Sequence, residues 1–75
     1  MLIQTEVGRA EVIAKQLASL PGVLSSEYVT GPYDVVVRIG ADSLGDLESN
    51  VVLSVQQVSG ITRTLTCPIA GGAQP

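Results

Sequence analysis

Hydrophobic residues along the chain change their spacing from one segment to the next, and each spacing predicts an element. Met1 to Glu6 is short and apolar at Leu2 and Ile3, which predicts a strand. The next apolar residues recur three or four positions apart, which predicts an amphipathic helix that Pro21 and Gly22 end at Leu20. This helical stripe consists of Ala10, Ile13, Ala14, Leu17 and Ala18.

The second part of the chain continues with a hairpin, another helix and a last strand. Residues 23–30 and 33–40 are rich in β-formers and flank the turn signal Gly31-Pro32, which predicts a β-hairpin. A helix that Gly60 ends comes next, with Asp42 or Ser43 as its cap and Asp46 near its first turn. Its apolar positions are Leu44, Leu47, Val51, Val55 and Val58. In residues 61–68, Thr62, Thr64 and Thr66 alternate with Ile61, Arg63, Leu65 and Cys67, which predicts a final strand.

The two halves of the chain repeat each other at an offset of 38 residues. The matched pairs are Ile13 with Val51, Leu17 with Val55, Leu20 with Val58, Gly22 with Gly60, and Val23 with Ile61. A repeated βαββαβ order predicts an α+β, ferredoxin-like sandwich, in which a four-stranded antiparallel sheet carries both helices on one face. Residues 1–68 form this single domain, and residues 69–75 are expected to be a flexible tail.

The sheet face away from the helices is predicted to be apolar and to drive dimerisation. Some of four residues should point outward: Leu24, Tyr28, Val36 and Leu65. The facing of residues 23–30 stays open, because a bulge would reverse it. Val (11), Leu (8) and Ile (5) make 24 of the 75 residues, but a chain of this size buries only about 60% of its surface on folding. We therefore expect copies to pack through their sheets.

Composition excludes several classes of function. The net charge of −3, from four basic and seven acidic residues, disfavours direct nucleic-acid binding. Without histidine, and with Cys67 as the one cysteine, the chain offers no metal set or activated nucleophile, so we expect no enzyme and no cofactor. Cys67 is expected to be a reduced, hydrophobic strand residue. Four carboxylates are expected to be solvated: Glu6, Glu11, Glu27 and Glu48. We find no signal peptide or membrane span, so we expect a soluble cytoplasmic chain.

Two groups of residues are candidates for ligand binding. In the turn, Gly31 allows close approach of a ligand, while Asp34 beside Tyr33 offers a carboxylate for an α-amino group. The alternative is an ordinary hairpin turn. Thr62, Thr64 and Thr66 lie at alternate positions of the last strand and could hydrogen-bond a carboxylate or amide, although threonine is also simply a good strand residue.

Four segments in order resemble the effector-binding domain of the Lrp/AsnC (feast/famine) transcription regulators. They are Leu20-Pro21-Gly22-Val23, Val29-Thr30-Gly31-Pro32-Tyr33-Asp34-Val35, Ala41-Asp42-Ser43-Leu44 and Ser59-Gly60-Ile61-Thr62-Arg63-Thr64-Leu65-Thr66. The resemblance implies dimers formed through the sheets, octamer-like rings of them, and an amino acid effector bound between subunits near the hairpin turn. It makes Gly31, Tyr33 and Asp34, with Thr64 and Thr66, the expected ligand contacts.

The helix-turn-helix domain that usually precedes this unit in the family is not found before Met1. The chain is therefore expected to sense a small metabolite, and to assemble with itself or with full-length Lrp/AsnC regulators. Two alternatives stay open. One is a purely structural assembly module, and the other is a dimeric ferredoxin-like enzyme, which would need a closed cavity inside one subunit.

Overall fold

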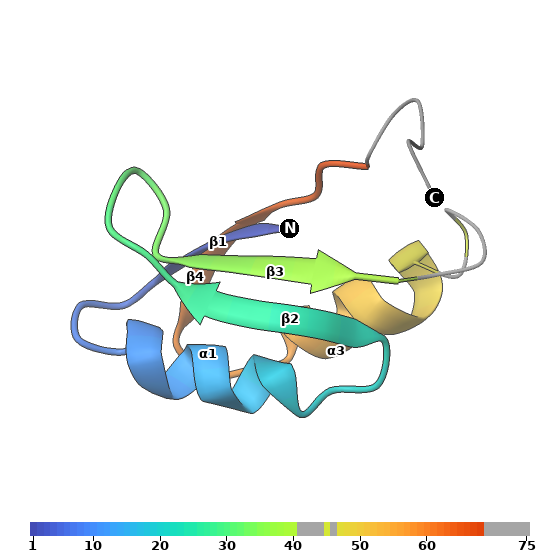
Figure 1. Ribbon diagram of the computed structural model, residues 1–75, viewed down its shortest axis with the longest axis horizontal. Coiled ribbons are helices and arrows are strands. Elements are labelled where there is room, and N and C mark those ends of the chain that lie inside the picture. Colours follow the sequence, from blue (N-terminus) through green and yellow to red (C-terminus); the bar gives the residue numbers. More distant parts are fainter. Residues whose placement is uncertain (41–44, 46, 69–75) are drawn as a thin grey trace.

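The computed structural model describes residues 1–40, 45 and 47–68. In this part of the chain the element order is β1 (Leu2–Thr5), α1 (Ala10–Ala18), β2 (Val23–Tyr28), β3 (Val35–Ile39), a π-helical segment (Leu47–Val52), α3 (Leu53–Gln56) and β4 (Ile61–Leu65). The elements have the predicted order βαββαβ (Figure 1). The second helix is divided into a π-helical and an α-helical part.

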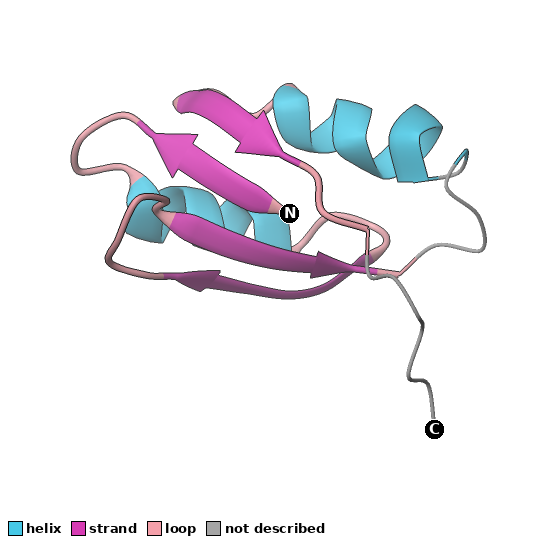
Figure 2. Ribbon diagram, turned by 90° about the horizontal axis from the view of Figure 1, so that it is seen from above, coloured by secondary structure: helices cyan, strands magenta, loops and turns pink. Residues whose placement is uncertain are grey.

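The four strands form one antiparallel sheet in the order β2-β3-β1-β4. The central strands are therefore β3 and β1, while β2 and β4 form the edges. Both helices pack on one side of this sheet (Figures 1 and 2). The predicted α+β, ferredoxin-like sandwich is confirmed.

One hydrophobic cluster joins the helices to the helix-facing side of the sheet. Its sheet residues are Ile3, Val35 and Val37, all with 0% exposure. Its helix residues are Ile13, Ala14, Leu17, Val51 and Val55. The predicted helical stripes are thus confirmed where they are described, except that Ala18 is exposed. Among the described residues, no helix has the length and apolar character needed to cross a bilayer.

The facing of the strands can be read from the register, because directly paired residues in an antiparallel sheet point to the same side. Leu2 pairs with both Val36 and Leu65, so these three lie on the face away from the helices (hereafter the open face), as predicted for Val36 and Leu65. Tyr28 pairs with buried Val35 and therefore points to the helix side, which answers the question of facing that the sequence left open for residues 23–30.

A bulge in β2 reverses the facing of the residues that follow it, including Tyr28. The register shifts between Val23 and Ser25, so Leu24 is an extra residue and is 73% exposed. Cys67 is exposed and lies beyond the end of β4 at Leu65, so the prediction of a hydrophobic strand cysteine is wrong. The predicted cap at Asp42 or Ser43, with Leu44 and Asp46, lies outside the described residues, as does the predicted tail.

Candidate functional site

The hairpin turn between β2 and β3 is attached to the end of β1 by three hydrogen bonds. Gln4 Nε2 donates to the Pro32 carbonyl oxygen at 2.8 Å, and the Asp34 backbone N–H donates to the Ile3 carbonyl oxygen at 2.8 Å. The Thr5 backbone N–H donates to Asp34 Oδ2, also at 2.8 Å. Long-range bonds of this kind hold a turn in one position, since moving the turn would break all three together.

Asp34 therefore has a structural task in the turn as well as a candidate binding task. Its Oδ2 lies 3.5 Å from the Thr5 hydroxyl in addition to the backbone bond, and its carbonyl oxygen accepts the Val29 N–H at 2.8 Å. Within the described part of the chain, Oδ1 accepts no hydrogen bond. A carboxylate can accept several hydrogen bonds, so Asp34 can hold Thr5 through Oδ2 and still offer Oδ1 to a ligand.

The other two turn candidates lie on the solvent side of this attachment. Gly31 is exposed, and its φ of 149° lies in a region that side chains disfavour. No atom lies within 4 Å of where a Cβ at Gly31 would stand. Tyr33 is half-buried. The turn extends beyond the end of the sheet (Figure 1), so its outer side is available to a ligand or to another subunit.

The threonines of β4 are not brought to the turn within one subunit. Thr64 pairs with Ile3 across β1 from Val35, so about 10 Å of sheet separates its backbone from that of β3. Thr66 comes after the end of β4 beside the start of β1, at the opposite end of that strand from Asp34. Thr62 occupies a bulge between Ile61 and Arg63 and is exposed. A site containing Thr66 and Asp34 would need parts of two subunits.

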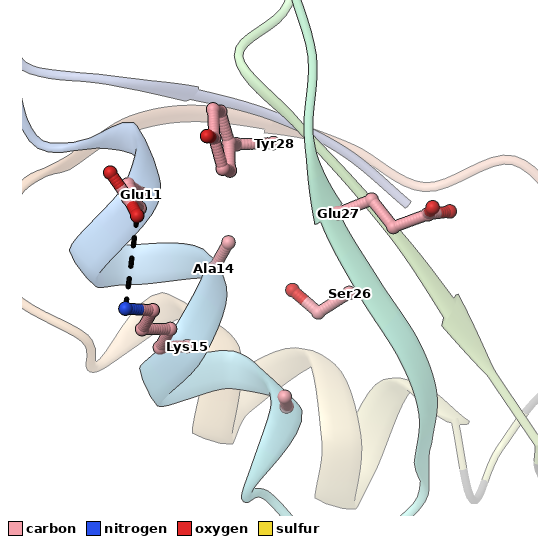
Figure 3. A pocket seen from close by; sticks show the side chains of 7 residues that line it. Glu11, Ala14, Lys15, Ser26, Glu27 and Tyr28 are labelled. Atoms are coloured by element: carbon pink, nitrogen blue, oxygen red, sulfur yellow. Dashed lines mark ion pairs between the residues drawn. The ribbon is translucent and has the colours of Figure 1, made fainter.

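The open face carries an apolar row with charges around it. Leu2, Val36 and Leu65 lie side by side, and Leu65 is 45% exposed. Two cations share this face, because Arg38 pairs with Ser25 and Arg63 pairs with Gln4. Glu27 pairs with Val36 and points away from α1 (Figure 3).

A groove of about 370 Å³ lies between α1 and β2 on the other side of the sheet. We call it the α1–β2 groove. It is lined by Glu11, Ala14, Lys15 and Ala18 from α1, and by Ser26, Glu27 and Tyr28 from β2, although the Glu27 side chain itself points to the open face (Figure 3). Five of these seven residues are exposed, so the groove is open to solvent and is not the closed cavity that an enzyme of this fold would need.

Sequence reasoning missed Gln4 and Thr5 as supports of the turn, and it missed the α1–β2 groove. The partners of Asp34 depend on strand pairing, which no local pattern encodes. The groove had a weak signal in Ala14 and Ala18, two small residues one helical turn apart that leave room beside β2. Tyr28 could not be assigned to the groove without knowing the bulge at Leu24.

Comparison with known families gives one match across almost the whole chain. The family described as the Lrp/AsnC ligand binding domain matches residues 1–70. Among curated proteins, an uncharacterised HTH-type transcriptional regulator of Pyrococcus furiosus is 26% identical over 54 residues, which cover 72% of this chain and 36% of that protein. The matched part is thus about a third of the length of that relative.

Solved structures share the fold over nearly the full length. The hypothetical protein PHS023 from Pyrococcus horikoshii superposes with a TM-score of 0.79 at 24% identity, covering 99% of this chain and 92% of its own. TTHA0845 from Thermus thermophilus has a TM-score of 0.74 at 26% identity, covering 91% and 92%. FFRP-DM1 has a TM-score of 0.73 at 26% identity, covering 83% of each chain.

Proposed function

Because this chain belongs to the Lrp/AsnC ligand binding domain family, we propose that it binds a small effector, an amino acid, and couples that binding to its own assembly. The observation that carries the proposal is the hairpin turn, which is held rigidly to β1 while its outer side and Asp34 Oδ1 stay accessible. A preformed acceptor loses little entropy when it binds a ligand ammonium group. In this proposal the chain acts in the cytoplasm, catalyses no reaction, and does not bind nucleic acid directly.

The proposed effector site lies between subunits. Gly31, Tyr33 and Asp34 contribute from one subunit, and Thr64 or Thr66 would come from another, since one subunit keeps Thr66 away from its own turn. An effector seated across such a boundary shifts the assembly equilibrium by its difference in affinity for the assembled and separate states. Full-length Lrp/AsnC regulators are proposed partners through the same surfaces.

The proposed dimer packs two open faces together. The apolar row Leu2, Val36 and Leu65 would form the centre, where burial is most favourable. In a twofold dimer the same patch meets itself, so each cation can approach a carboxylate of the other copy. The open face carries both signs, with Arg38 and Arg63 near the row and Glu27 beside it. Dimers of this kind are proposed to join further into octamer-like rings.

The test combines ligand titration with measurement of mass. Isothermal titration with a panel of amino acids, followed by light scattering with and without the effector, should give heat for at least one amino acid and a change in oligomer size. Asp34→Asn should abolish the heat, because it removes the charge while leaving an amide oxygen that can still accept from the Thr5 N–H. Heat from no amino acid, with constant mass, would reject the sensor function.

A second candidate is an assembly module that binds no effector. One observation favours it: Asp34 Oδ2 is already engaged by Thr5, so an aspartate at this position has a structural reason to exist. Under this function, Asp34→Asn leaves assembly and stability nearly unchanged, and no amino acid alters the mass. The same two measurements therefore separate the candidates.

A further inference from the structure

The α1–β2 groove contains a polar atom that nothing in the described chain satisfies. Ser26 Oγ is shielded from solvent and is the one such side-chain nitrogen or oxygen without a hydrogen-bond partner among the described residues. Figure 3 shows Ser26 pointing from β2 toward Ala14 of α1, into the groove. A shielded hydroxyl without a partner costs free energy, which a ligand that hydrogen-bonds it would recover.

The walls of the groove are apolar on both sides of Ser26. Ala14 and Ala18 line the groove from α1 with small apolar side chains. The Tyr28 ring stands over the groove on the strand side (Figure 3). The volume of about 370 Å³ falls at the small end of the range for ligand pockets. These walls suit a short aliphatic chain, since anything larger would extend into solvent.

The α1 rim of the groove carries both signs of charge. Lys15 Nζ lies 3.7 Å from Glu11 Oε2, and the two side chains are 78% and 59% exposed. An ion pair this exposed is weak, so either partner can exchange its contact for a ligand group. A simple anion would meet Glu11 as well as Lys15, on a chain of net charge −3. An α-amino acid zwitterion can contact both residues at once, because its ammonium and carboxylate groups are attached to the same carbon atom.

From these three features we propose that the α1–β2 groove is a second binding site, complete within one subunit, for a small zwitterion with a short aliphatic tail. The charged groups lie against Glu11 and Lys15, and the tail lies between Ala18 and Tyr28. Ser26 Oγ has almost no accessible surface in the unliganded chain, so the side chains around it shift on binding and let it bond a polar atom of the ligand. This site needs no partner subunit and lies in a different place from the turn, so it is independent of the effector site proposed above.

The probe is L-leucine, titrated into the full 75-residue chain labelled with ¹⁵N. Saturable amide shifts are expected at Lys15, Ala18, Ser26 and Tyr28. Ser26→Ala should weaken binding by about twofold to tenfold, the range for one hydrogen bond. 3-Methylbutylamine and 4-methylpentanoate keep the tail but lack one charge each, and each should bind about twofold to fivefold more weakly.

A matched pair of variants tests the location. Ala18→Leu fills the groove from an exposed position and should abolish the groove shifts, whereas Gln16→Leu adds the same side chain to α1 outside the groove and should leave them. Amide dispersion reports whether each variant is folded. If Ala18→Leu does not fold, Lys15→Gln replaces it, with an expected loss of about twofold to fivefold.

The amide map also separates this site from the effector site. Shifts confined to Gly31 through Asp34 would overturn the groove site and leave the turn site standing. Shifts confined to the groove would support the groove site and count against the turn site for this probe. Groove shifts that persist unchanged in Ala18→Leu, or no saturable shift at all, would reject the groove site.

Discussion

Gly60 lies directly against Ile13: a Cβ atom at Gly60 would come within 2.9 Å of Ile13 Cδ1. The same relationship recurs in the other half of the fold, where a Cβ at Gly22 would lie 2.9 Å from Val51 Cγ2. Ile13 and Val51 are equivalent positions of the internal repeat, as are Gly22 and Gly60. Each helix is therefore packed against the glycine that ends the other helix, and both glycines have positive φ, 88° and 98°.

Gly60→Ala should lower the free energy of unfolding by about 2–5 kcal/mol. Adopting positive φ costs a residue with a Cβ about 1–2 kcal/mol, and overpacking adds about 1–3 kcal/mol. Gly8→Ala is the matched control, because Gly8 has a φ of 81° but no atom within 4 Å of the added Cβ. Gly8→Ala should therefore cost only the free energy of holding positive φ, without the overpacking. Urea unfolding at one fixed protein concentration measures both. Equal losses for the two variants would contradict the packing argument.

A double-mutant cycle isolates the contact itself. Ile13→Val removes Cδ1, the atom that the new methyl group would meet. Gly60→Ala should therefore cost less in the Ile13→Val background than in the parent, with a coupling of about 0.5–2 kcal/mol. Additive effects would show that backbone strain alone accounts for the loss.

Leu65→Glu should weaken self-association if the open faces pack together. Leu65 belongs to the apolar row of the open face, and a carboxylate buried there should raise the dissociation constant about a hundredfold, because its desolvation costs free energy. Val12→Glu is the control, since Val12 is 50% exposed but lies on α1. Light scattering over a range of micromolar concentrations gives the mass. An unchanged mass for Leu65→Glu, or equal dissociation by both variants, would place the interface elsewhere.

Asp34→Ala should free the end of β1. The Thr5 N–H loses its acceptor, which costs about 1–2 kcal/mol and speeds hydrogen exchange at the Thr5 amide. Asp34→Asn retains an amide oxygen at the same place and should preserve most of the protection. If both variants exchange at the parent rate, the carboxylate does not hold the turn.

Ser26→Ala should leave the free energy of unfolding unchanged or raise it by up to about 1 kcal/mol. The substitution removes a shielded hydroxyl that has no partner in the described chain, together with its desolvation penalty. Ser25→Ala, on the open face opposite Arg38, is the control and should stay within about 0.5 kcal/mol of the parent. A loss above about 1 kcal/mol for Ser26→Ala alone would mean that the hydroxyl has a stabilising partner.

Stability should rise with pH as the α-amino group of Met1 titrates. Burial lowers the pKa of this group below its ordinary value of 8.0, and the charge of Cys67 opposes that shift. Between the folded pKa and 8.0 the unfolded chain binds more protons, so raising the pH through this window stabilises the fold. Acetylating the amine should remove this slope in urea unfolding. A slope that survives acetylation would have another origin.

The amino-acid sequence by itself determined the elements, their order and the layer of the sandwich in which each core residue lies. Helical residues such as Ile13 and Val55 carry that information locally, because a spacing of three or four places them on one side of a helix. The internal repeat also determined which glycines end the helices. The turn residues Gly31 to Asp34 were recognised from composition and from resemblance alone.

Only the tertiary structure decided which residues meet across strands. The bulge at Leu24 moved Tyr28 to the helix side, where it lines a groove with α1. Pairing between β1 and the hairpin gave Asp34 its bond to Thr5, and pairing between β1 and β4 kept Thr66 away from the turn. One extra residue in a strand reverses the facing of the residues after it, and its energy depends on partners distant in sequence, so local spacing does not encode it.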